Sequence, residues 1–172
     1  MSTSQTQIPG VEARAFRSAM GRYASGVTVV TGHDGAEPVG FTCQSFYSVS
    51  IEPMLVSFCV MKTSTSYPRI RSSGRFAVNV LAGEQEEVST RFARKGVDKW
   101  AGLEWGMSGA GNPLLPGALL SVCCRLWAEH DAGDHWIVLG EVQQVSMPDE
   151  PSDPLLFYRG AYHRLAALGS AA

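Results

Sequence analysis

Residues 40–68 set narrow bounds on the fold of this chain, because they enclose a short apolar run between two groups of hydroxyl side chains. The run, residues 54–61, is apolar apart from Ser57 and contains β-branched and aromatic residues, which predicts a buried strand rather than a helix. If residues 41–46 and 54–61 are antiparallel neighbours, the second hydroxyl group returns beside the first. The stretch then lines a site for a polar ligand with an apolar body. The alternative is that Ser and Thr only fill loop positions.

Strand signals separated by turn residues continue along the chain. Asp34-Gly35 predicts a hairpin turn after a β-branched strand at residues 27–31. Further strands are expected at residues 76–80, 119–130, 135–147 and 155–158, and irregular structure is expected at residues 97–117 and 148–154. This pattern indicates a mainly β fold, an antiparallel closed or half-closed barrel.

A few short helices are expected beside the strands. Apolar residues recur at helical spacing from Val11 to Tyr23, which predicts a helix that ends near residues 25–26. Pro68 suits the first turn of a second helix that Gly74 closes, and a third is expected at residues 84–95 with Gly96 as its C-cap. The length of 172 residues predicts one domain, residues 11–166, with tails at residues 1–10 and 167–172.

Composition excludes several classes of function. The net charge of −2, without a run of Lys or Arg, gives no support for binding nucleic acid. No uncharged apolar run reaches membrane-spanning length, and the N-terminal residues lack the apolar core of a signal peptide. The four cysteines, Cys43, Cys59, Cys123 and Cys124, form no CxxC pair, which favours buried free thiols over disulfides or metal ligands. We therefore expect a globular cytoplasmic protein without a metal.

Five segments follow one another in an order that resembles the flavin reductase family, whose fold is the FMN-binding split barrel. They are GVTVVT at residues 26–31, VGFTCQSFYSVSIEPMLVSFC at residues 39–59, FAVNVL at residues 76–81, GDHWIVLGEV at residues 133–142 and LLFYRGAYHRL at residues 155–165. The resemblance implies an antiparallel split β-barrel with a few peripheral helices that pairs as a homodimer. It also implies the reductase component of a two-component flavin-dependent monooxygenase acting on phenolic or steroid-derived phenolic compounds.

The resemblance also implies which residues contact the flavin, FMN or FAD. Thr65 and Ser66, with Lys62 and Ser64 nearby, match the loop on the phosphate side, where hydroxyl and backbone N–H groups suit an anion. The other matching positions are Gln44, Ser45, Ser48, Val49 and Ser50 at the ring edge, Cys59, Val60 and Met61 along the ring, and the helical pair Arg91 and Phe92. From the residues alone, a solvated helix charge is the preferred interpretation of Arg91, and a core thiol is the better account of Cys59.

The hydride donor, NADH or NADPH, approaches through other segments in the resemblance. The matching positions are Pro38, Val39, Gly40, Phe41 and Thr42, and later Phe157, Tyr158, Arg159 and Gly160. His135 matches a histidine that meets the nicotinamide, and it is the catalytic candidate, with a role in orientation rather than proton transfer. From the residues alone, a lone histidine at the start of a strand is more often a surface or turn residue. Since no GxGxxG fingerprint follows a strand, a Rossmann dinucleotide site is not expected.

Hydride transfer between a nicotinamide and a flavin requires no nucleophile and no acid–base pair, because the cofactors carry the reactive atoms. The protein has to hold the reacting atoms at roughly 3–3.5 Å. The sequence shows no obvious catalytic dyad, which fits this chemistry but also fits a binding protein. Two functions therefore stay open: an NAD(P)H-dependent flavin reductase that supplies a partner monooxygenase, and a non-catalytic flavin-binding protein of the same fold.

Overall fold

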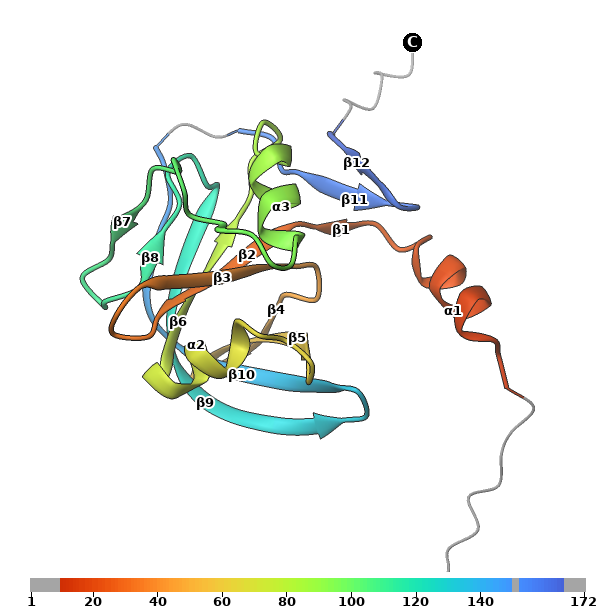
Figure 1. Cartoon of the computed structure of the whole chain (residues 1–172), viewed down its shortest axis with the longest axis horizontal. Coiled ribbons are helices and arrows are strands. Elements are labelled where there is room, and N and C mark those ends of the chain that lie inside the picture. The colour runs from red at the N-terminus through yellow and green to blue at the C-terminus, as the bar shows by residue number, and fades with distance from the viewer. Residues whose placement is uncertain (1–9, 150–151, 166–172) are drawn as a thin grey trace, which may run out of the picture.

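One antiparallel sheet of seven strands curls into a barrel and forms most of the molecule (Figure 1). The computed structural model describes residues 10–149 and 152–165. Across the sheet the strands lie in the order β3 (Pro38–Cys43), β2 (Thr28–His33), β6 (Arg75–Val80), β9 (Leu120–Ala132), β10 (His135–Ser146), β5 (Met54–Met61) and β4 (Tyr47–Ile51). The expected mainly β, antiparallel fold with a few peripheral helices is therefore confirmed.

The barrel is open, because its edge strands β3 and β4 do not pair with each other, and β3 approaches β5 without forming a ladder. The hydroxyl of Ser45, in the connection from β3 to β4, binds the backbone of β5: its Oγ accepts the N–H of Cys59 at 2.8 Å and donates to the Cys59 carbonyl at 3.3 Å. The expected direct pairing of residues 41–46 with residues 54–61 is wrong, because β5 pairs with β4 and β10. A tight turn at Glu52-Pro53 brings β4 back onto β5, so the nearer segment takes that edge.

The barrel interior is filled by aromatic and β-branched side chains. The ring of Phe58 packs edge-on against Phe76 at 5.2 Å between centroids and tilts against Phe41 at 5.9 Å. Val30 and Val78 are fully buried beside them. Burial of this apolar surface is the main term that stabilises the sheet, so the core holds β2, β5 and β6 in fixed positions around the open side.

The helices lie outside the barrel (Figure 1). α2 (Tyr67–Ser73) ends at Gly74, which adopts the left-handed conformation at φ 68°, as expected. α3 (Glu86–Ala93) has Arg94 as its C-cap, so the expected C-cap at Gly96 is wrong. The ammonium group of Lys99 donates to the carbonyl of Phe92 at 2.8 Å. A side chain thus satisfies a carbonyl of the last turn, and a glycine cap is not required there.

Short strands occur in segments where the sequence predicts the end of a helix or irregular structure. α1 (Ala13–Met20) is shorter than expected, because β1 (Ser25–Gly26) pairs with β11 (Leu156–Tyr158). β12 (Ala161–His163) completes that sheet, and it was missed because three residues are too few to show alternation. Within the expected irregular residues 97–117, β7 (Gly106–Met107) and β8 (Pro113–Leu114) form a small ladder. The long hairpin of β9 and β10 and the turn at Asp34-Gly35 are confirmed.

Several broader expectations concern the chain as a whole. All four cysteines are free thiols, three of them buried and Cys59 partly buried. Across residues 10–149 and 152–165, no cluster of side chains could hold a metal ion, and no helix combines the length and apolar character that crossing a membrane requires. The expected tails lie, apart from Gly10, outside the described residues, so the domain boundaries stay a prediction.

Candidate active site

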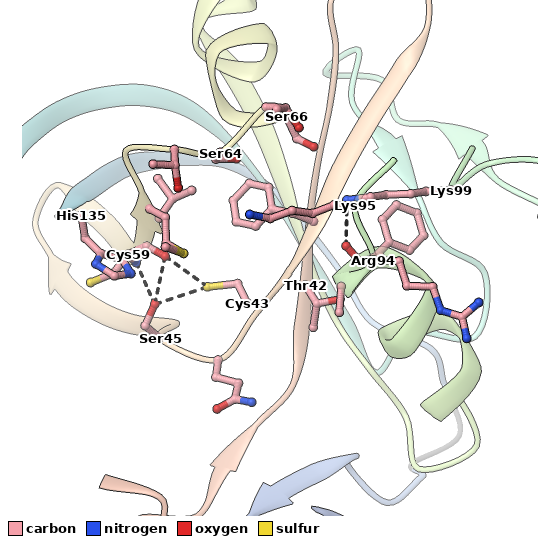
Figure 2. Close-up of a pocket in the computed structure, with 18 of the residues that line it drawn as sticks. Thr42, Cys43, Ser45, Cys59, Ser64, Ser66, Arg94, Lys95, Lys99 and His135 are labelled. Atoms are coloured by element: carbon pink, nitrogen blue, oxygen red, sulfur yellow. Dashed lines mark hydrogen bonds between the residues drawn. The ribbon is translucent and has the colours of Figure 1, made fainter. Parts of the chain in front are cut away.

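A cavity of about 490 Å³, called the first cavity below, opens at the gap between β3 and β5 (Figure 2). Segments far apart in sequence line it: the end of β3, the end of β5, the loop after β5, the end of α3, and side chains of β11 and β12. Thr42 and Ser45 therefore meet the second cluster of hydroxyl residues, 63–66, at one cavity.

Hydroxyl groups around the first cavity hold the backbone that shapes it. The Ser66 hydroxyl donates to the carbonyl of Gly40 at 3.1 Å, and the Thr42 hydroxyl donates to the carbonyl of Ser89 at 2.6 Å. Ser64 Oγ accepts the N–H of Tyr67 at 3.1 Å. A hydroxyl has one donor and two acceptor sites, so each of these groups retains capacity to accept a further bond.

Aromatic side chains form the apolar wall of the first cavity. They are Phe41, Phe92, Phe157 and Tyr162. Phe92 is fully buried, and Tyr162 is held at its hydroxyl by Ser89 Oγ at 2.8 Å. At Gly40 an added Cβ would lie 2.7 Å from the Phe92 ring, so only glycine lets β3 pass this close to α3.

His135 lies at the rim of the first cavity, at the start of β10. Its Nδ1 lies 2.6 Å from Oδ1 of Asp134. This contact is the main cause that lowers the pKa of the Asp134 carboxyl below its ordinary value. In a neutral ring the Nδ1–H then donates to the carboxylate and Nε2 is left as an acceptor. The arrangement suits a ring that orients a ligand.

Three cations, Arg94, Lys95 and Lys99, also line the first cavity, and the sequence did not single them out. Figure 2 shows the Lys95 side chain reaching across the cavity. The ammonium group of Lys99 is held by the carbonyls of Phe92 and Gly40, and burial lowers its pKa. The pair Arg94-Lys95 after a helix was the available sequence signal. Lys99 gave none, because its place depends on how the following loop folds back.

Comparison with known proteins identifies the family. Residues 20–166 match the family model described as a flavin reductase like domain. The chain belongs to the flavin reductase family. This membership confirms the resemblance found from the five ordered segments and fits the open barrel described above.

Relatives and solved structures of this flavin reductase family cover most of the chain. HsaB, a reductase subunit of a flavin-dependent monooxygenase from Rhodococcus jostii, is 47% identical over 152 residues, covering 88% of this chain and 77% of that protein. SmoA, an FMN reductase (NADH) from Agrobacterium fabrum, is 40% identical over 167 residues, covering 96% and 94%. An NADH:FAD oxidoreductase from Streptomyces globisporus, solved with NAD and FAD fragments, matches with a TM-score of 0.86 at 35% identity, covering 91% and 94%.

Most residues that the sequence indicated as ligand contacts line one of two adjoining cavities in this flavin reductase. Those at the first cavity are Phe41, Thr42, Gln44, Ser45, Cys59, Val60, Met61, Ser64, Thr65, Ser66, Phe92, His135 and Phe157. Pro38, Val39 and Gly40 line the other cavity, which shares Thr65 and Ser66 with the first.

Other indicated residues lie away from the first cavity. Ser48, Val49 and Ser50 belong to or flank the ladder of β4 with β5, and their side chains do not line the first cavity. The Arg91 guanidinium donates to the carbonyl of Ala101 at 2.9 Å and faces a separate hollow beside α3. Their assignment as ligand contacts stays a prediction.

Lys62 and residues 158–160 were also indicated as ligand contacts, but in the structure they contact other parts of the protein. The Lys62 ammonium group bonds the Asp131 carboxylate at 2.7 Å, and Lys62 does not line the cavities. Tyr158 ends β11, and Arg159 and Gly160 form the turn to β12, where the Arg159 N–H donates to the carbonyl of Gly21 at 2.8 Å. The N-terminal segment holds this turn, which the sequence gave no means to foresee.

The first cavity fits the parts of a flavin. A flavin has a flat, largely apolar ring with a polar edge and a chain that ends in phosphate. Aromatic walls suit the ring, the side-chain amide of Gln44 can bond its polar edge, and the hydroxyl groups of Thr65 and Ser66 suit an anion. We therefore take this cavity as the candidate active site.

Proposed function

We propose that this protein transfers a hydride from NADH or NADPH to FMN or FAD and passes the reduced flavin to a partner monooxygenase. The observation that carries the proposal is the first cavity, where aromatic walls, an amide and a hydroxyl loop converge at the open side of the barrel. The names of HsaB and of the two NADH-dependent relatives support this reaction.

In this proposal the chain binds and orients, and the ligands supply the reactive atoms. A bound flavin accepts the hydride, and the nicotinamide donates it. Gln44 and the segment Cys59–Met61 hold the ring, and Thr65 and Ser66 hold the phosphate. His135, fixed by Asp134, orients the nicotinamide carboxamide through Nε2. The aromatic walls keep water from the reacting atoms.

The proposal includes a homodimer. α1 has no buried residue and extends from the barrel in Figure 1, which leaves Phe16 and Met20 exposed, each by 55%. On β4, Tyr47, Val49 and Ile51 are exposed as well. Apolar surface of this kind supports pairing with a second copy. The four free thiols and the nicotinamide donor support a cytoplasmic location.

The partner in this proposal is the oxygenase component of a two-component monooxygenase, with a phenolic or steroid-derived phenolic compound as its substrate. HsaB, itself named as such a reductase subunit, supports an oxygenase partner. The competing function is a flavin-binding protein without turnover. It shares every contact described above, so only a kinetic measurement separates the two.

Steady-state turnover with the four flavin–nicotinamide combinations tests the proposal. Purified protein mixed with NADH or NADPH and free FMN or FAD is expected to oxidise the nicotinamide only when flavin is present. Tight flavin binding without nicotinamide oxidation in any combination would support the non-catalytic alternative and contradict the reductase.

A further inference from the structure

A second cavity of about 420 Å³ adjoins the first and shares part of its wall. The shared side chains are Thr65, Ser66, Arg94, Lys95 and Lys99. The loop after β5, which carries Thr65 and Ser66, thus lies between the two cavities and lines both of them. A ligand whose phosphate lies at this loop can extend from the first cavity into the second.

The shared wall carries positive charge that the protein does not neutralise. None of the ion pairs within residues 10–149 and 152–165 includes Arg94, Lys95 or Lys99. Lys99 donates two bonds to backbone carbonyls, and an ammonium group has a third donor left. Figure 2 shows the Arg94 guanidinium turned away from Lys95, so the two lysines are the cations that face the loop.

The other charged side chains of the second cavity already have partners. Arg69 bonds Asp34 and also the Glu37 carboxylate at 2.6 Å. The Asp98 carboxylate accepts the N–H groups of Trp100 and Ala101 at 2.9 and 3.1 Å. An incoming anion therefore finds Lys95 and Lys99 as the available cations.

We propose that the second cavity takes the adenylate-side phosphate of FAD, held by Lys95 and Lys99, so that the protein binds FAD more tightly than FMN. This inference rests on the proposed function, in which the phosphate next to the flavin lies at Thr65 and Ser66. In FAD a single oxygen bridges the two phosphorus atoms. Since Thr65 and Ser66 line both cavities, a pyrophosphate at this loop places one phosphate on each side.

The direct test compares Kd for FMN and FAD in the wild type and in Lys95→Gln. Both flavins carry about two negative charges at pH 7, so a general loss of positive charge weakens both equally. Loss of a contact to the second phosphate weakens FAD alone. We expect the Kd for FAD to rise about tenfold, the scale of one charge-assisted hydrogen bond, and the Kd for FMN to change by less than about twofold.

Two variants serve as controls. Lys95→Arg keeps the charge and is expected to retain most of the preference for FAD. Arg75→Gln removes one charge from a side chain outside both cavities and is expected to leave both Kd values unchanged.

Equal weakening of FMN and FAD in Lys95→Gln would overturn the inference, because Lys95 would then bind the phosphate that both flavins share. Unchanged affinity for both would also overturn it. So would an effect seen only as a higher KM for NADPH and not for NADH, which would assign Lys95 to the 2′-phosphate. If the wild type reduces both flavins and Lys95→Gln gives one of these results, the reductase proposal stands and only the inference about the second cavity fails. A wild type that binds neither flavin contradicts both proposals.

Discussion

Some side chains at the first cavity bind the backbone of the barrel, although the sequence indicated them only as ligand contacts. Ser45 and Ser66 were indicated as ligand contacts, and both line the cavity. Yet the Ser45 hydroxyl bonds both backbone groups of Cys59, and the Ser66 hydroxyl bonds Gly40. Residue type and family order could indicate these positions. The backbone partners could not be predicted, because they come from strands that meet only in the folded barrel.

Ser45→Ala is expected to lower the free energy of unfolding by about 1–2 kcal/mol, because the partly buried N–H of Cys59 loses its acceptor. Urea unfolding measures the change, and Ser72→Ala, on the exposed face of α2, is the matched control. Flavin affinity is expected to fall as well, since this hydroxyl fixes the gap that forms the cavity. Wild-type stability in Ser45→Ala would show that the bonds from the β3–β4 connection to Cys59 of β5 contribute little.

His135→Ala is expected to raise the KM for the nicotinamide or slow hydride transfer, at a cost of roughly 1–2 kcal/mol, with little effect on flavin affinity. The reason is that His135 and Thr65 lie on different segments of the cavity wall. His130→Ala, an exposed histidine of β9 outside both cavities, is the control. Loss of flavin with normal nicotinamide kinetics would assign His135 to the flavin instead.

Among the elements, the loop after β5 and the β9–β10 hairpin act as one unit. The Lys62 N–H donates to the carbonyl of Asp134 at 2.9 Å, its ammonium group bonds Asp131, and the same group lies 4.9 Å from the centroid of the Trp136 ring. These contacts join the hydroxyl loop to the turn that carries His135. Lys62 thus holds the hydroxyl loop and His135 in place relative to each other, although Lys62 itself does not line either cavity.

Lys62→Met is therefore expected to lower the free energy of unfolding by about 0.5–1 kcal/mol, since both the ion pair and the ring contact are solvent-screened. The Kd for FMN is expected to stay within about twofold, less than the loss of one charge-assisted bond. A double-mutant cycle with Asp131→Asn isolates the pair. A large loss of FMN affinity without loss of stability would make Lys62 a flavin contact, as the family resemblance implied.

Elements differ in how well the sequence predicts them. The hairpin at Asp34-Gly35 and the Gly74 end of α2 follow from local backbone preferences, and both were predicted. The end of α3 depends on Lys99, which is brought in by tertiary structure, and its prediction was wrong. The pairing of β5 was also wrong, since strand alternation indicates which face is buried but not which neighbour is adjacent.

At the scale of the whole molecule, the barrel class and the family could be predicted from the order of strand and turn segments, and both are confirmed. The position of the open side could not, because it depends on which strands take the edges of the sheet in the folded barrel. The places of Lys95 and Lys99 at the cavity could not be predicted from the sequence either. They become neighbours of Thr65 only when α3 packs on β3.

The position of flavin in a crystal structure of this protein grown with FMN tests the central claim most directly. The account predicts the flavin ring in the first cavity, against Gln44 and Cys59–Met61, with its phosphate at Thr65 and Ser66. Flavin bound elsewhere, such as the hollow beside α3 that Arg91 lines, with no density in the first cavity, would contradict the account.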